Sequence, residues 1–204
     1  MGKEAQGHPD ATLAGRAMQA LGAAFLERHA DPAALVPVVP RLAALAADPK
    51  QPGENGNLAF DLIARTGKDH CLLPLAKLAR SHDPVRSWSA VQHGLACAGV
   101  DGIQPMAEAL PTDRDYDPAI IEKYFWKDAA ALGTGAATPA RTLLGSASWV
   151  ARLTGAELLA KLGTPSDAQL LRTLAKDSAP LRGWTVPTVG AEATKLADRL
   201  EKVQ

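Results

Sequence analysis

Several residue classes are scarce in this chain of 204 residues, and each scarcity excludes a class of protein. Aromatic residues make up only 4% of the sequence, and no alternating apolar and polar run predicts a β-strand. The two cysteines are too few for a disulfide scaffold. No apolar run approaches the ~18 residues that cross a bilayer, so we expect no membrane span.

The chain also lacks an excess of charge of either sign. Lys and Arg together number 22, as do Asp and Glu, which gives a formal net charge of zero. Nucleic acids and anionic membrane surfaces attract proteins with a cationic excess, so we expect neither as a partner. A local basic face is still compatible with this balance.

The amino terminus contains no apolar segment of the kind found in secretory signal peptides. This absence predicts a cytoplasmic protein; a periplasmic or lipid-anchored protein whose leader has been removed is the alternative. We expect residues 1–9 to form a disordered tail and residues 10–204 to form a single domain.

Alanine and leucine dominate the sequence, which predicts helix throughout. The expected helices come in pairs joined by short turns, and the Pro- and Gly-rich segment 49–57 is expected to be a loop. The expected ranges are 10–29 with 32–47, 58–66 with 68–80, 83–98 with 100–110, 117–132 with 137–144, 148–163 with 167–176, and a last, interrupted helix over 180–202.

Three marks recur every 30 to 34 residues, which is the length of a helical hairpin repeat. They are helix-ending glycines at Gly67, Gly99, Gly133 and Gly163, second-helix prolines at Pro40, Pro74, Pro105 and Pro139, and Asp-Pro helix openers at Asp83 and Asp117. We expect the glycines to adopt the left-handed conformation of a helix C-cap. The phrase at 83–88 also returns at 179–184, which is 96 residues, or three times 32, further on.

These marks resemble HEAT-like repeats of the short bacterial kind, also known as the PBS-lyase type. The resemblance is carried by Asp83-Pro84-Val85-Arg86, Ala90, Leu95, Gly99, the segment 103–110 and the phrase at 158–163. It implies an all-α fold, an α-solenoid (α-α superhelix) of about five helical hairpins, with the helix at 191–204 as a C-terminal cap. Tetratricopeptide and armadillo-like arrays are the alternatives. The repeat is too general to carry over the lyase activity.

One cluster has side chains that bind metals: Asp69-His70-Cys71 together with His93 and Cys97. His93 and Cys97 are four residues apart on one helix face, a spacing that can hold a metal. However, His70 and Cys71 point about 100° apart on a helix, so a four-ligand cage is awkward. We expect plain packing of buried cysteines, with a zinc site or a Cys71–Cys97 disulfide as alternatives. No cofactor is predicted.

The aromatic triplet Tyr124-Phe125-Trp126 is the other unusual feature. Three consecutive side chains span three sides of a helix and cannot all face one core. We therefore expect Tyr124 or Trp126 to be exposed as part of a contact surface. Packing of the triplet against the loop around Tyr116 is the alternative.

In HEAT-like repeats the second helices usually line the concave face. The outward basic residues expected there are Arg41, Lys77, Arg80, Arg141, Arg172 and Lys176, against the single acid Glu108. This balance predicts a mildly positive groove that binds an acidic segment of another protein. An ordinary solvated face is the alternative.

Together these features predict a non-catalytic scaffold or adaptor that binds protein. The sequence contains neither a Gly-rich phosphate loop nor the His-Glu pairs of HEAT-like di-iron hydroxylases. We therefore predict that the protein is not an enzyme. An enzyme or a protein that handles a cofactor or metal, built on the same repeats, is the alternative.

Overall fold

The computed structural model describes residues 9–28, 30–51 and 53–202 of the chain. Over these ranges the backbone forms helices and turns, with one isolated antiparallel bridge between Pro180 and Thr188. The predicted all-α class is therefore confirmed. The expected tail at 1–9 lies outside the described residues except for Pro9, which begins the first helix. None of the described helices is long and apolar enough to cross a bilayer.

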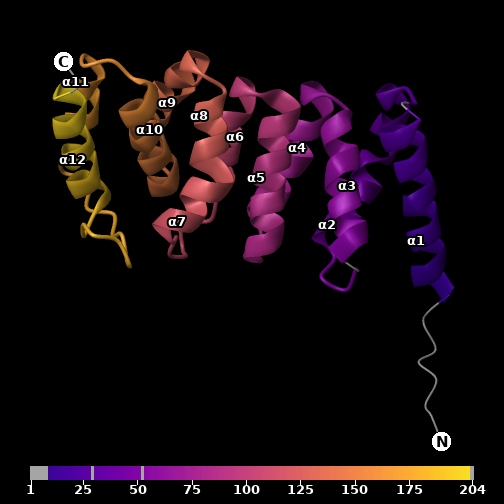
Figure 1. Cartoon of the computed structure of the whole chain (residues 1–204). Coiled ribbons are helices and arrows are strands. Elements are labelled where there is room, and N and C mark those ends of the chain that lie inside the picture. The colour runs from indigo at the N-terminus through magenta and orange to yellow at the C-terminus, as the bar shows by residue number, and fades with distance from the viewer. Residues whose placement is uncertain (1–8, 29, 52, 203–204) are drawn as a thin grey trace, which may run out of the picture.

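The helices stand side by side in one long row (Figure 1). The first helices of the successive pairs are α1 (Pro9–Gly22), α3 (Gly53–Arg65), α5 (Pro84–Ala98), α7 (Pro118–Ile121) with α8 (Lys127–Ala131), α10 (Trp149–Leu162) and α12 (Val189–Glu201). The second helices are α2 (Val39–Ala47), α4 (Lys68–Ala79), α6 (Val100–Ala109), α9 (Ala137–Leu143) and α11 (Asp167–Arg172). Short π-helical or 3-10 turns complete the row: η1 (Ala23–Glu27), η2 (Pro32–Val38), η3 (Glu122–Trp126) and η4 (Thr134–Ala136).

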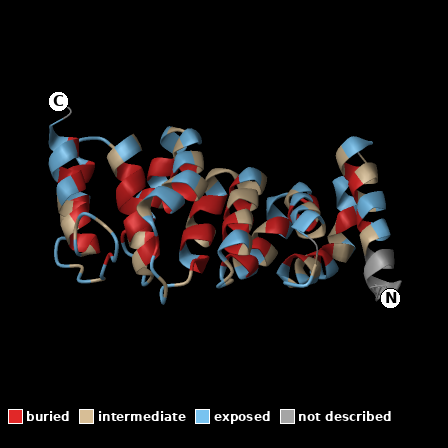
Figure 2. Ribbon diagram, turned by 60° about the horizontal axis from the view of Figure 1, so that its bottom comes forward, coloured by how far each residue is buried: buried red, intermediate tan, exposed pale blue. Residues whose placement is uncertain are grey.

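Helices pack on their neighbours in the chain. First helices contact first helices, as in α1–α3, α3–α5 and α10–α12, while α2–α4, α4–α6 and α6–α9 do the same among the second helices. One continuous core runs along the row between the two sets of helices (Figure 2). Its largest fully buried side chains include Phe60, Ile103, Phe125 and Leu143, which come from different pairs.

Aspartates open the helices as the sequence predicts. The Asp83 carboxylate accepts hydrogen bonds from the backbone N–H groups of Val85 and Arg86, and Asp117 does the same at the start of α7. These bonds satisfy donors that have no partner inside the helix. The proline that follows each aspartate has no N–H to satisfy and suits the first helical turn.

Arginine near the start of two first helices donates to backbone carbonyls of preceding segments. Arg86 pairs with Asp83 and donates to the carbonyls of Ala46 and Asp48, where α2 ends. Arg152 of α10 lies four residues after its N-cap Ser148 and donates to the carbonyls of Ser146 and Ala147, directly before that helix. Helix-end carbonyls need external donors, and a half-buried guanidinium supplies several at once.

The turn glycines are needed, but in a different conformation from the one predicted. Gly67, Gly99 and Gly133 have φ of 81°, 56° and 79°, with ψ of 162°, −130° and −162°. These ψ values lie far from the left-handed helix and in or near a region that only glycine occupies readily. Gly163 has a φ of −75° and is extended, so the left-handed C-cap prediction was wrong at all four positions.

Several helix boundaries differ from the prediction; α11, expected over 167–176, ends at Arg172. Residues 53–57 were expected to belong to a loop, but they form the start of α3 despite their Asn and Gly residues. Residues 180–187 were expected to be helical and are not: Gly183 has a φ of 78°, and Pro180 pairs with Thr188 instead. Ala179 also lacks the carboxylate with which Asp83 caps α5, so the recurring phrase at 179–184 does not open a helix.

We predict that Gly67→Ala lowers the free energy of unfolding by about 1–2 kcal/mol, because alanine at this positive φ is strained. Nothing lies within 4 Å of a Cβ added there, so steric contact is not the cause. Gly56→Ala is the matched control. It is equally unobstructed but lies inside α3, so it should raise stability by about 0.5–1 kcal/mol. Urea unfolding of both variants measures the difference, and equal effects would contradict the turn geometry.

Candidate functional site

The basic residues predicted on the second helices fall into two groups, and Arg141 belongs to the group that is already paired. Its guanidinium makes two bonds to Asp167, with Nε–Oδ1 at 2.7 Å and Nη2–Oδ2 at 2.9 Å. The Asp167 side chain is only 4% exposed. Hydrogen bonds from Arg141, supported by Thr164, lower the pKa of Asp167 to about 2 despite this burial. Arg141 therefore neutralises a buried carboxylate.

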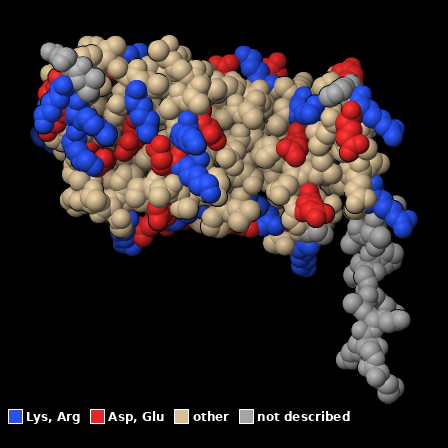
Figure 3. Space-filling view, in the orientation of Figure 1, with Lys and Arg blue, Asp and Glu red and all other residues tan. Residues whose placement is uncertain are grey.

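Arg172 is also paired within the chain. Its Nη2 lies 2.9 Å from Asp198 Oδ1 and 2.8 Å from Glu201 Oε2, both on α12. Figure 3 shows acidic and basic side chains interspersed at this end of the molecule. Arg141 and Arg172 thus join helices, and neither adds a free positive charge to the second-helix face.

The other group comprises Arg41, Lys77, Arg80 and Lys176, which are all exposed. Among the described residues, the ion pairs involve none of these four. Arg41 lies on α2, and Lys77 and Arg80 lie one turn apart at the end of α4. Three of the four free cations are therefore gathered at the α2–α4 pair.

An apolar depression of about 500 Å³ lies between these two helices. We call it the proline groove; its lining residues are Val39, Pro40, Ala43 and Ala47 of α2 and Leu73, Pro74, Lys77 and Leu78 of α4. Leu73 is 69% exposed. Lys77 places its charge on the same lining. The groove thus combines an exposed apolar anchor with a cation.

Small and rigid residues explain why the groove is open. Ala43 and Ala47 leave space on α2 that longer side chains would fill. Pro74 lies inside α4 and has no N–H to donate to the His70 carbonyl one turn earlier. Pro105 and Pro139 line a second depression of about 320 Å³ between α6 and α9. The four predicted prolines therefore all lie in second helices, and in two cases neighbouring prolines share a groove.

The predicted aromatic contact surface is wrong for Trp126. Phe125 and Trp126 are buried, and the Trp126 indole N–H donates to the Thr154 hydroxyl at 3.0 Å. Tyr124 is half-buried and stacks on Trp88 with ring centroids 6.1 Å apart. The residues 122–126 form the π-helical turn η3, which alters the angular spacing assumed for an α-helix. The triplet is packed, but its described ring contacts are with Trp88 and Trp184 rather than with the predicted Tyr116 loop.

Tryptophans from later in the chain cover this unit. The Trp184 indole N–H donates to the carbonyl of Tyr116, and the Trp149 indole N–H donates to the carbonyl of Thr112, both at 2.8 Å. Trp184 also contacts Trp126, with ring centroids 5.9 Å apart. The positions of Trp149 and Trp184 near the starts of expected first helices predict packing between repeats, and these contacts agree with that prediction.

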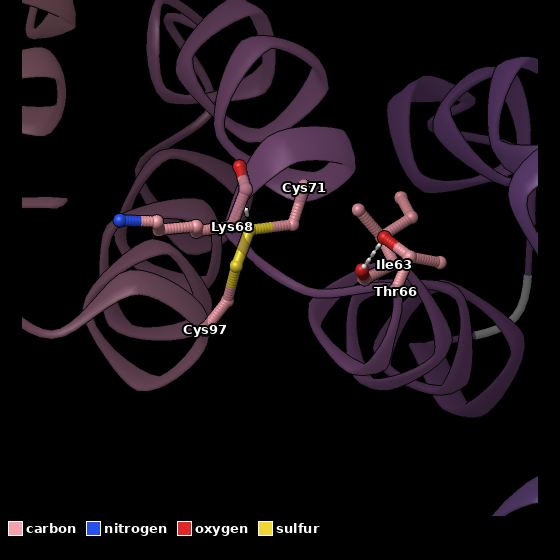
Figure 4. Close-up of a disulfide and its surroundings, with 5 residues drawn as sticks. All are labelled: Ile63, Thr66, Lys68, Cys71 and Cys97. Atoms are coloured by element: carbon pink, nitrogen blue, oxygen red, sulfur yellow. Dashed lines mark hydrogen bonds between the residues drawn. A yellow bond between two sulfur atoms is a disulfide. The ribbon is translucent and has the colours of Figure 1, made fainter. Parts of the chain in front are cut away.

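The proposed metal ligands serve other purposes. Cys97 forms a disulfide with Cys71, which links the start of α4 to the end of α5 (Figure 4). His93 lies 2.9 Å from Asp61 Oδ1 through Nε2 and 2.7 Å from the Ser89 carbonyl through Nδ1. Both ring nitrogens therefore have partners, and the described residues contain no group of three metal-binding side chains. The disulfide alternative is correct, and the expectation of unpaired cysteines was wrong.

Two further buried carboxylates, Glu157 and Glu192, lie between α10 and α12. Glu157 is 8% exposed, and burial raises its pKa to about 7, assisted by the neighbouring Glu192. Glu192 is paired with Lys195 at 3.0 Å. Glu157 has no such bond among the described contacts, so its ionisation near neutral pH places an unpaired charge in this interface.

We predict that Arg141→Ala lowers the free energy of unfolding by about 2 kcal/mol at pH 7, because it leaves the Asp167 carboxylate buried and unpaired. The pKa of Asp167 is depressed in the folded state, so this stabilisation is present above pH 4 and is lost as the pH falls towards about 2. Arg172→Ala, which breaks exposed pairs, should cost less than Arg141→Ala. Chemical unfolding at several pH values measures both, and a pH-independent loss for Arg141→Ala would contradict this assignment.

Glu157→Gln should have the opposite effect. The folded-state pKa of Glu157 is raised, so wild-type stability is fully present below the unfolded pKa of about 4.5 and declines until the pH passes about 7. The variant removes this decline and should be more stable than wild type by about 2 kcal/mol at pH 8, but by little at pH 4. Thermal unfolding across this range is the measurement, and a variant less stable at pH 8 would show that Glu157 is well solvated.

Comparison with known proteins identifies no relative that assigns a function to this surface. No protein-family model matches the chain, and neither a curated protein nor a solved structure matches it. The functional argument therefore depends on the geometry described above.

Proposed function

We propose that the chain is an α-solenoid of HEAT-like hairpins. The supporting features are the alternation of first and second helices, the packing of each pair on its neighbours, and the two Asp-Pro openers, the first of which is followed by Arg86. Glycine at three of the interhelical turns has the same kind of positive-φ conformation. In such arrays each repeat relies on the next one for its core, and an extended surface is left free for binding.

We propose further that this surface binds a protein partner and does not catalyse a reaction. The observation that carries the proposal is the proline groove, where exposed Leu73 lies beside Lys77 with Arg80 one turn further along α4. Exposed apolar side chains flanked by charged residues are typical of protein-binding surfaces. A nucleic-acid partner is disfavoured by the formal net charge of zero.

The disulfide bears on where the protein acts. Disulfides persist in oxidising compartments such as the bacterial periplasm and are rare in the cytosol. The Cys71–Cys97 pair therefore favours the periplasmic alternative over the cytoplasmic expectation.

We predict that a photo-crosslinking amino acid on the second-helix face captures a discrete partner in the native cell. The two positions to label are Leu73 in the proline groove and Thr142 on α9, which lines the α6–α9 depression. The matched control position is Arg65 on α3, which lines a depression among first helices. Mass spectrometry of the adducts should show the same protein from one or both second-helix positions and not from Arg65. Adducts from Arg65 alone, or from none of the three positions, would contradict protein binding at this face.

A further inference from the structure

We infer that the proline groove accepts a short amphipathic helix of a partner protein, with two apolar side chains one turn apart and an acidic residue beside them. The inference depends on the proposed function, since it specifies the partner of the same face.

The shape of the groove favours a helix. Its lining on α2 extends from Val39 to Ala47, eight residues along the helix, or about 12 Å at 1.5 Å per residue. Two partner side chains four residues apart are separated by about 6 Å along a helix and fit within this length. The groove also lies between two adjacent packed helices, which is the kind of surface on which a third helix packs by placing its ridge of side chains between them.

The lining disfavours the other common ways of binding a peptide. Strand addition needs an exposed sheet edge, and the described residues contain no sheet. Polyproline segments bind grooves walled by aromatic rings, whereas this groove is lined by Val, Pro, Ala, Leu and Lys. An apolar groove with an exposed leucine suits the apolar face of an amphipathic helix.

The charges specify the flank of the partner helix. Lys77 and Arg80 lie three residues apart on α4, and Arg41 lies on α2 next to Pro40. All three are exposed, and none takes part in an ion pair among the described residues. The exposed acids nearby are Asp69, at the other end of α4, and Glu108, on the adjacent helix α6. An acidic residue on the partner should therefore face the C-terminal half of α4, where the positive charge is gathered.

A membrane surface is a different kind of partner for a leucine beside cations. The shape of the groove argues against a membrane partner. Leu73 lies at the edge of a depression, with Ala43 and Ala47 on the opposite wall, and not on a convex apolar surface. Membrane binding by this groove would therefore overturn the inference.

The test is selection from a displayed library of helical 16-residue peptides against the oxidised, full-length protein. The recovered peptides should carry two apolar residues three or four apart, with Asp or Glu enriched over Lys or Arg next to them. Fluorescence anisotropy of a selected peptide should then show at least tenfold weaker binding to Leu73→Ser and at least fivefold weaker binding to Lys77→Glu or Arg80→Glu. Because these side chains are exposed, circular dichroism should show unchanged folding.

Matched controls come from the other end of the row. Leu170 on α11 is 40% exposed and Lys176 follows that helix, so Leu170→Ser and Lys176→Glu should leave affinity within twofold of wild type. A pool without acidic enrichment, a pool rich in helix-breaking residues, or binding that survives Leu73→Ser would overturn the inference. So would wild-type binding to vesicles of 30% phosphatidylserine that Lys77→Glu abolishes. If the library fails while Thr142 still crosslinks a partner in cells, the inference fails and the proposed function stands.

Discussion

Each helix pair buries its apolar side only because the next pair covers it, and the rest of the structure depends on this burial. The continuous core from Phe60 through Ile103 and Phe125 to Leu143 is built from residues of successive pairs, so no single pair holds a core of its own. Specific side-chain bonds also hold neighbouring pairs in fixed positions relative to one another. Arg86 binds the end of α2, the Cys71–Cys97 disulfide joins α4 to α5, and Arg141 reaches across to Asp167.

Local chemistry made much of this predictable from the sequence. Asp83 and Asp117 cap their helices through the residues that follow directly, so a short phrase is sufficient to place a helix start. The phrase at 179–184 failed because Ala179 cannot supply a carboxylate and because Trp184 bonds to the distant Tyr116 carbonyl. A partner 68 residues away leaves no mark in the local pattern.

At the candidate site, too, local features were predictable from the sequence and contacts between distant residues were not. Sequence spacing placed Arg41, Lys77, Arg80, Arg141 and Arg172 correctly on second helices, but it could not tell which charges are already paired. Asp167 and Asp198 lie 26 residues from their arginines, a distance that only the fold brings together. The proline groove was anticipated only through Pro40 and Pro74, since its openness depends on how α2 and α4 sit side by side. Of the six basic residues predicted on second helices, Arg141 and Arg172 are paired, and three of the four others lie at the α2–α4 pair.

The extended row of helix pairs is the central claim, and small-angle X-ray scattering of the full chain in solution tests it most directly. A compact globule of this length has a radius of gyration of about 17 Å. A row of first helices from α1 to α12 spaced 8–10 Å apart gives about 19 Å or more, with a pair-distance distribution that tails to long distances. That result is the one expected. A symmetric distribution with a radius near 17 Å would contradict the row, and with it the second-helix face as an extended binding surface.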